Sequence, residues 1–237
     1  MEGAGMAAVC ARLREEAEGI WRALHDHPFI RELAAGILPP EKFRFYIEQN
    51  LLYLPEYGRA IAIGASKAHD LAELGEFASA LTNIVETEIP ENRRLLERTI
   101  DLGAADMGGT LVMAPANVAY TSYLISAAYR GGPLEVMTAL MPCAWSYGDI
   151  ATRLDAVADH PVYADWVAFF ASSRYNDLVA DMRTQLESMA ADASPTQQDA
   201  LSAIFQMGAR LEWGFWEMGY TLAQWPDVRV TRPAAVA

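Results

Sequence analysis

The sequence predicts an all-α fold, a single-domain helical bundle over residues 1–237. Apolar residues recur at three- and four-residue spacing along nearly the whole chain, which is the period of one buried helix face. No stretch alternates apolar and polar residues between hairpin turns, so we expect no β-sheet. No internal repeat or low-complexity linker divides the 237 residues, and this length is compatible with one large domain.

Start and stop residues delimit the expected helices. Gly36 and Gly103 are expected helix ends, because glycine accepts the left-handed conformation that follows a last helical turn. Pro40 and Pro133 are expected in first turns, where the missing N–H is not needed, and Ser194 is expected as an N-cap. The expected helices cover about 7–25, a short segment ending at Gly36, 40–67, 71–101, 116–130, a helix starting at Pro133, 161–170, 174–192 and 195–222, with 223–237 as a frayed tail.

The composition is that of a globular protein of a reducing compartment. Hydrophobic residues make up 52% of the chain and charged residues 21%, which leaves ample material for a core. No run of about 18 apolar residues predicts a membrane span, and the N-terminus lacks the pattern of a signal peptide. The two cysteines, Cys10 and Cys143, form neither a disulfide framework nor a metal motif. We therefore expect a cytoplasmic protein.

The formal net charge of −13 excludes some partners. Nucleic-acid affinity comes largely from Lys and Arg side chains that neutralise phosphates, so direct binding of DNA or RNA is not expected. Anionic membranes are disfavoured for the same reason. The simplest consequence of the charge is solubility.

Three of the expected helices carry polar residues on faces where aliphatic residues are usual. Residues three, four or seven positions apart lie on one side of a helix, so each group is expected to share a face. The groups are Tyr46, Asn50 and Tyr53 at i, i+4 and i+7; Cys143 and Tyr147 at i and i+4; and Glu212 and Phe215 at i and i+3.

Glu212 stands among aromatic residues in "LEWGFWEMGY". A buried carboxyl in such a setting is costly unless it is paired or protonated. Burial would raise its pKa toward the range that suits proton transfer near neutral pH. A Glu212 that points to solvent between buried neighbours fits the pattern equally well.

Cys143 follows Pro142 within an expected helix, and the proline is expected to kink that helix. On the pattern alone, an inert buried cysteine is favoured over a nucleophile. A nucleophilic cysteine needs a partner that holds or removes its proton. The histidines form no Cys-His motif that the sequence reveals, so a carboxylate or hydroxyl would have to act as that partner.

No metal site is expected. His25 and His27 in "HDHP" lack i, i+4 spacing on a clear helix, and capping of the first helix is their simplest role. Glu86, Glu88 and Glu91 lack the Glu-x-x-His motif of di-iron bundles.

Five segments occur in the order and approximate spacing of one family: "FRFYIEQNLLYL", "AYTSYL", "LMPCAWSYGDI", "HPVYADWV" and "LEWGFWEMGY". The chain resembles the TenA family, thiaminase II, over nearly its whole length. The resemblance implies a heme-oxygenase-like helical fold and a homotetramer. It implies hydrolysis of aminopyrimidines, chiefly 4-amino-5-aminomethyl-2-methylpyrimidine, and cleavage of thiamin, in thiamin salvage. It implies no metal and no cofactor.

The resemblance also implies roles for individual residues. Each role is carried over only where the motif matches, and it makes a nucleophilic Cys143 the favoured interpretation. Cys143 would add to the pyrimidine ring, Glu212 would bind the aminopyrimidine and move protons, Tyr53 and Tyr147 would lie near the thiol and ring nitrogens, Tyr120 would line the pocket, and Phe215 would stack on the heterocycle.

Two positions depart from the family pattern. Asn50 stands where the family usually has an aspartate, and an asparagine can neither carry charge nor take a proton. Phe170 stands where many members have an aromatic hydroxyl. Both changes make the substrate pocket less polar. Two alternatives therefore stay open: a binding protein that holds a pyrimidine without turnover, and a hydrolase of another heterocycle on the same fold.

Overall fold

The computed structural model describes residues 9–106, 108, 111–154 and 160–226. These residues form helices and connecting segments without any strand, which confirms the all-α prediction. The helices are α1 Val9–Glu16, α2 Glu18–His25, α3 Pro28–Ala34, α4 Pro40–Ala65, α5 Leu71–Asn83, the π-helical turn η1 Ile84–Glu88, α6 Ile89–Asp101, α7 Pro115–Arg130, α8 Pro133–Arg153, α9 Pro161–Phe170, α10 Ser173–Met189 and α11 Pro195–Thr221.

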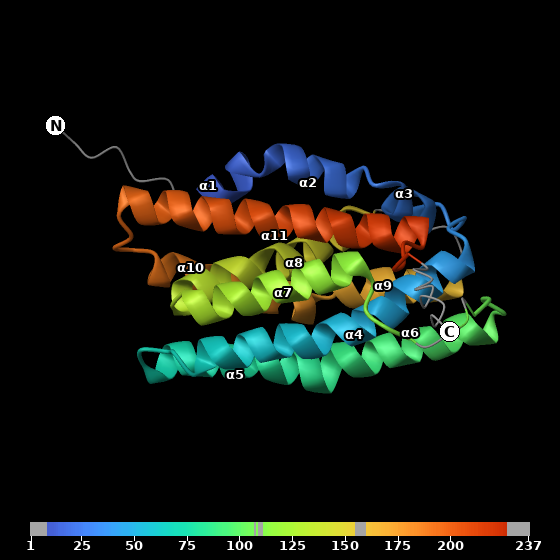
Figure 1. Cartoon of the computed structure of the whole chain (residues 1–237), viewed down its shortest axis with the longest axis horizontal. Coiled ribbons are helices and arrows are strands. Elements are labelled where there is room, and N and C mark those ends of the chain that lie inside the picture. Colours follow the sequence, from blue (N-terminus) through green and yellow to red (C-terminus); the bar gives the residue numbers. More distant parts are fainter. Residues whose placement is uncertain (1–8, 107, 109–110, 155–159, 227–237) are drawn as a thin grey trace, which may run out of the picture.

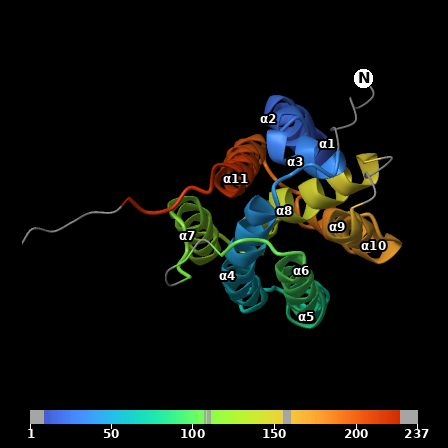
Figure 2. The ribbon, with the colours of Figure 1, turned by 90° about the vertical axis from the view of Figure 1, so that its right-hand side faces the viewer.

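The bundle brings four helices, α4, α7, α8 and α11, into mutual contact. The long helices run roughly along the long axis of the molecule (Figure 1). In the end-on view α4 and α8 lie near the centre, with the other helices around them (Figure 2). Helix α11 packs against α8, α7 and α4, and α4 also packs against α8. Residues from all of these helices therefore line one hydrophobic core.

The expected stop and start residues act as predicted. Gly36 and Gly103 have φ angles of 69° and 85°, the left-handed region in which glycine carries no steric penalty. Ser194 caps α11, and its side chain and that of Gln197 satisfy each other's backbone N–H groups. Residues 227–237 of the expected tail lie outside the described residues. Before them, the Trp225 indole donates to the carbonyl of Met113 at 2.8 Å.

The expected helix at 7–25 is divided into α1 and α2 by one residue, Ala17; residues 7 and 8 lie outside the described part. Backbone hydrogen bonds continue through the break, from Ala17 N to Leu13 O and from Trp21 N to Ala17 O. A single non-helical residue leaves the apolar spacing intact, so the pattern did not reveal it.

The expected helix at 71–101 contains the π-helical turn between α5 and α6. The N–H of Ile89 bonds to the carbonyl of Ile84, five residues earlier. Pro90 follows directly and has no N–H, so a regular bond from residue 90 to Glu86 is impossible in any case. The turn accommodates one extra residue within an otherwise α-helical segment.

Helix α8 continues through Pro142 to Arg153. Pro142 packs against Gly208 of α11, where an added Cβ would stand 2.8 Å from the proline Cγ. Only glycine allows the two helices to approach this closely. The contact fixes α8, which carries Cys143, against α11, which carries Glu212.

None of the helices that the structure describes is long and apolar enough to cross a membrane.

Candidate active site

Residues predicted from α4, α7 and α11 meet in the core. The Tyr53 ring lies 5.0 Å from that of Tyr120 and 5.4 Å from that of Phe215, between centroids. The Tyr120 hydroxyl donates to Glu212 Oε2 at 2.9 Å. Cys143 from α8 is close enough for its pKa to be raised by Glu212 and lowered by the Tyr53 hydroxyl. The structure thus brings five of the predicted residues together.

Glu212 is buried, with 1% of its surface exposed, so the alternative in which it points to solvent is wrong. Burial raises its pKa to about 7, although the hydroxyls of Tyr120 and Tyr147 oppose that rise. Near neutral pH the carboxyl is therefore present in both protonation states. Such a group can take a proton from one atom and return it to another.

Tyr147 is oriented by a chain of hydrogen bonds. The Trp166 indole N–H can only donate, and it donates to the Tyr46 hydroxyl at 3.2 Å. Tyr46 in turn donates to Tyr147 at 3.2 Å. Because Tyr147 accepts this bond, its own proton remains available for Glu212. Tyr46 and Trp166 therefore belong to the site, although only the position of Tyr46 on the Asn50 stripe indicated this.

The Cys143 thiol rests protonated. Burial raises its pKa well above the usual range, and the charges of Glu212 and Glu88 raise it further. The residue nevertheless keeps some accessible surface. A thiol in this state attacks only when a neighbouring base takes its proton.

The Tyr53 hydroxyl lies close to the thiol and to Tyr120, and it lowers the pKa of both groups. Its buried Oη nevertheless forms no well-aligned hydrogen bond with a described residue. A buried unpaired hydroxyl is costly, and a polar group of a bound ligand would satisfy it.

Asn50 is buried on α4, one turn before Tyr53. Its Nδ2 donates to Asn92 Oδ1 at 2.9 Å, and Asn92 Nδ2 donates to the carbonyl of Glu88 at 2.9 Å. Sequence reasoning did not single out Asn92. Its partnership with Asn50 depends on the packing of α6 against α4, which no local pattern reveals.

Phe170 is buried behind Tyr147, with 4.8 Å between the ring centroids. It also lies 5.0 Å from the Tyr175 ring, whose hydroxyl donates to the carbonyl of Ala144. Phe170 supports the Tyr147 ring and brings no polar atom of its own.

Glu88 is a second buried carboxyl near the site. Burial raises its pKa to about 8, and the Asn83 amide, which donates to Glu88 Oε1 at 2.9 Å, opposes that rise. Its negative charge raises the pKa values of Cys143 and Tyr57. Glu88 is the last residue of the π-helical turn and is 8% exposed.

The histidines considered at the sequence level have structural roles. His25 Nε2 lies 3.0 Å from Asp149 Oδ2. His27 is the N-cap of α3 rather than a cap of the preceding helix, and its Nδ1 accepts from the N–H of Phe29. Over the described ranges, no group of three or more His, Cys, Asp or Glu side chains is placed to hold a metal ion.

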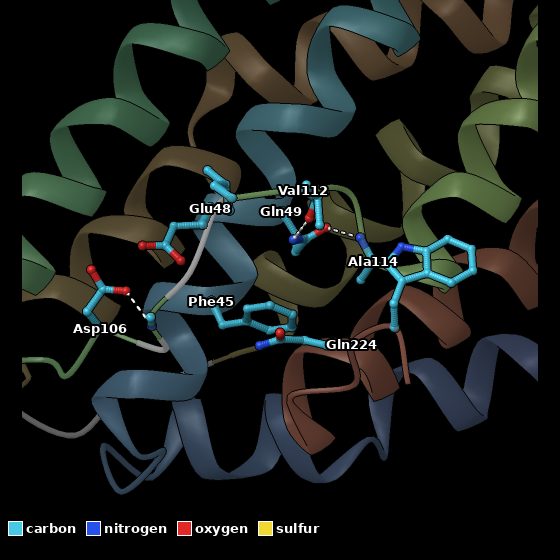
Figure 3. Close-up of a pocket in the computed structure, with 10 residues that line it drawn as sticks. Phe45, Glu48, Gln49, Asp106, Val112, Ala114 and Gln224 are labelled. Atoms are coloured by element: carbon cyan, nitrogen blue, oxygen red, sulfur yellow. Dashed lines mark hydrogen bonds between the residues drawn. The ribbon is translucent and has the colours of Figure 1, made fainter. Parts of the chain in front are cut away.

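A surface pocket of about 180 Å³ opens beside Gln49, the residue before Asn50 (Figure 3). The Gln49 amide donates to the carbonyl of Val112 and accepts from the N–H of Ala114, both at 2.9 Å. These bonds hold the segment before α7 against α4. Neither Cys143 nor Glu212 lines the pocket, so it is distinct from the cluster around the thiol.

Comparisons with known proteins agree with this arrangement. The model of the TENA/THI-4/PQQC family matches residues 14–222. The aminopyrimidine aminohydrolase of Halalkalibacterium halodurans is 33% identical over 91% of this chain and 96% of its own length. That of Helicobacter pylori is 31% identical over 88% and 96%. The TenA homologue of P. horikoshii OT3 superposes with a TM-score of 0.78 at 32% identity, over 91% of this chain and 99% of its own. The resemblance drawn from the sequence is confirmed: the chain belongs to the TENA/THI-4/PQQC family.

Proposed function

We propose that this protein is a cysteine-dependent aminopyrimidine aminohydrolase of the thiaminase II type. Its substrate is 4-amino-5-aminomethyl-2-methylpyrimidine, its product is the 5-hydroxymethyl compound, and thiamin is a further substrate. The observation that carries the proposal is a buried thiol beside a buried carboxyl whose pKa is about 7. Relatives named aminopyrimidine aminohydrolase, at 25% to 33% identity over most of the chain, support the same activity.

The reaction needs a nucleophile and a group that moves protons. Glu212, in its ionised form, takes the proton of the Cys143 thiol as the sulfur adds to the pyrimidine ring. The protonated carboxyl then gives a proton to the departing amine, and the bond between the exocyclic carbon and nitrogen breaks. Water adds to that carbon as the ionised Glu212 carboxylate takes one of its protons. Expulsion of the sulfur restores the ring, and the sulfur regains its proton from Glu212 to give the thiol. Overall, one water is consumed and one ammonia is released.

Aromatic residues bind the heterocycle in this proposal. Phe215 offers a ring face for an offset stack, and it lies beside Tyr53. The unpaired Tyr53 hydroxyl and the hydroxyls of Tyr120 and Tyr147 satisfy the polar atoms of the substrate. Asn50 supplies a neutral amide where the family usually carries a carboxylate.

We further propose that the chain acts as one domain, in the cytoplasm, as a homotetramer without a nucleic-acid partner. The continuous core and the net charge of −13 support the first and last of these statements. Light scattering of the purified protein measures the assembly.

Ammonia release from 4-amino-5-aminomethyl-2-methylpyrimidine tests the proposed activity. Cys143→Ser is expected to abolish turnover while the Tm stays close to that of the wild type. Cys10→Ser is the matched control, because Cys10 is also buried but bonds to the carbonyl of Arg183. Turnover that survives in Cys143→Ser would exclude the nucleophile role. Binding of the pyrimidine without product would favour the binding-protein alternative.

A further inference from the structure

Asn50 can present either end of its amide to a ligand, and the two ends have opposite hydrogen-bonding character. The nitrogen donates and the oxygen accepts. Which heterocycle fits therefore depends on what holds the amide in one orientation. The hydrogen bonds behind Asn50 decide this.

The orientation is fixed from the backbone outward. The carbonyl oxygen of Glu88 can only accept a hydrogen bond, so the atom of Asn92 that lies 2.9 Å from it must be Nδ2. The other end of the same amide, Oδ1, therefore faces Asn50. Because Oδ1 accepts, the atom of Asn50 that lies 2.9 Å away must be Nδ2. A flip of either amide would place two acceptors or two donors together.

Neither amide can exchange its partner for water. Asn50 is 4% exposed and Asn92 is 2% exposed, and an unpaired polar group at such a position is costly. The Asn50 Oδ1 is the end of the amide that is not bonded to Asn92, and it accepts no side-chain or backbone hydrogen bond from the described residues. This oxygen is one turn along α4 from Tyr53, whose hydroxyl is also unpaired within the described part of the chain.

We propose that Asn92 is a positioning residue that locks Asn50 so that only its acceptor oxygen faces the substrate. The site then selects heterocycles that present an N–H donor at that point, such as an exocyclic amino group, over analogues with an oxo group there. This inference rests on the proposed function for the substrate class. The hydrogen-bond relay from Glu88 through Asn92 to Asn50 is independent of turnover.

The relay has a consequence for the family's usual aspartate. In an Asn50→Asp variant, the ionised carboxylate would place an acceptor against Asn92 Oδ1. If Asn92 turned to donate to the carboxylate, its Oδ1 would face the Glu88 carbonyl instead. Either arrangement leaves two buried acceptors in contact, so Asn50 and Asn92 form a matched pair. Asn50→Asp alone is expected to disturb the site rather than restore the family pattern.

Calorimetric binding of 4-amino-5-aminomethyl-2-methylpyrimidine and of its 4-oxo analogue tests the selection, alongside turnover. The wild type is expected to favour the amino compound by about tenfold or more. Asn92→Leu keeps the volume but removes both bonds, so this preference is expected to fall and KM to rise about tenfold, with kcat changed less than KM. Asn83→Leu is the control, because Asn83 bonds to the Glu88 side chain instead and its loss should leave the preference unchanged. An unchanged preference in Asn92→Leu would overturn the proposal.

A cycle of Tm measurements tests the relay without any ligand. Asn50→Asp is expected to lower the Tm by several degrees in the presence of Asn92 and by less in the Asn92→Leu background, where the conflicting acceptor is gone. Equal losses in both backgrounds would overturn the matched pair, whatever the protein hydrolyses. If the wild type binds and discriminates but releases no ammonia, the proposed function fails while the positioning role stands.

Discussion

Two acidic residues close to α8 have opposite electrostatic surroundings. Asp149, on α8 itself, accepts from the Trp21 indole at 2.6 Å and lies near His25 and Arg153. Burial favours its neutral form, but the bonds from His25 and Trp21 outweigh burial and lower its pKa to about 2. Among the described residues, Glu212 is bonded only by phenolic hydroxyls, and its pKa rises to about 7. Burial alone does not make a carboxyl reactive; the absence of strong or cationic donors does.

The largest expected difference between the two acids is catalytic. Glu212→Gln is expected to lower kcat by about a hundredfold to ten-thousandfold, the range for a lost general acid or base. Asp149→Asn is expected to change kcat only a few-fold, because Asp149 holds α2 against α8 and does not touch the thiol cluster. Steady-state ammonia release measures both. Comparable losses would mean that Asp149 also takes part in the chemistry.

The pH dependence of stability should differ in sign. Glu212 ionises near 4.5 in the unfolded chain and near 7 in the folded one, so its burial costs stability as the pH rises through this range, by about 3 kcal/mol in all. Asp149 contributes stability above its ordinary pKa of 3.8, which is lost as the pH falls to about 2. Urea unfolding of wild type and Glu212→Gln at pH 5 and 8 checks the first statement. If the difference in unfolding free energy between wild type and Glu212→Gln were the same at both pH values, the predicted cost of burying Glu212 would be contradicted.

The contact between Pro142 of α8 and Gly208 of α11 can be tested separately from Asp149 and Glu212. Gly208→Ala is expected to destabilise the protein by about 1–3 kcal/mol, because the new methyl group would overlap Pro142. Gly214→Ala on the same helix is the control: its Cβ would meet nothing within 4 Å, and a helical alanine should stabilise slightly. Chemical denaturation measures both. Equal effects would show that helix propensity, rather than packing, governs these positions.

The smallest expected effect concerns the Trp21 indole, which donates a hydrogen bond to Asp149. Trp21→Phe keeps an aromatic ring stacked on Phe205 but removes the indole N–H. A loss of about 1 kcal/mol is expected, together with a rise in the pKa of Asp149. Acid unfolding should then begin at a higher pH than in the wild type. An unchanged acid transition would assign the low pKa to His25 and Arg153.

The fold was largely predictable from the sequence, because glycine, proline and N-cap residues mark the helix ends in "AGILPP" and "ADASPTQ". The residues around the thiol were predictable only through the resemblance to a family. Spacing on α4 groups Asn50 with Tyr53, but no spacing relates α4 to α8 or α11. Whether Glu212 is buried or exposed was undecided on the pattern alone.

Sequence reasoning missed Asn92 and Trp166, because their side chains bond to residues on another helix. A regular helix over 71–101 places no special weight on Glu88 or Asn92. The π-helical turn at Ile84–Glu88 was missed as well. Such a turn has no periodic signature, since it is one insertion within an otherwise regular pattern.

The protonated resting state of Cys143 has a consequence for the durability of the protein. Peroxides and other oxidants attack the thiolate much faster than the thiol. A cysteine whose pKa is held far above its usual range by burial therefore resists conversion to sulfenic acid. The burial that keeps Cys143 protonated therefore also protects it from oxidation.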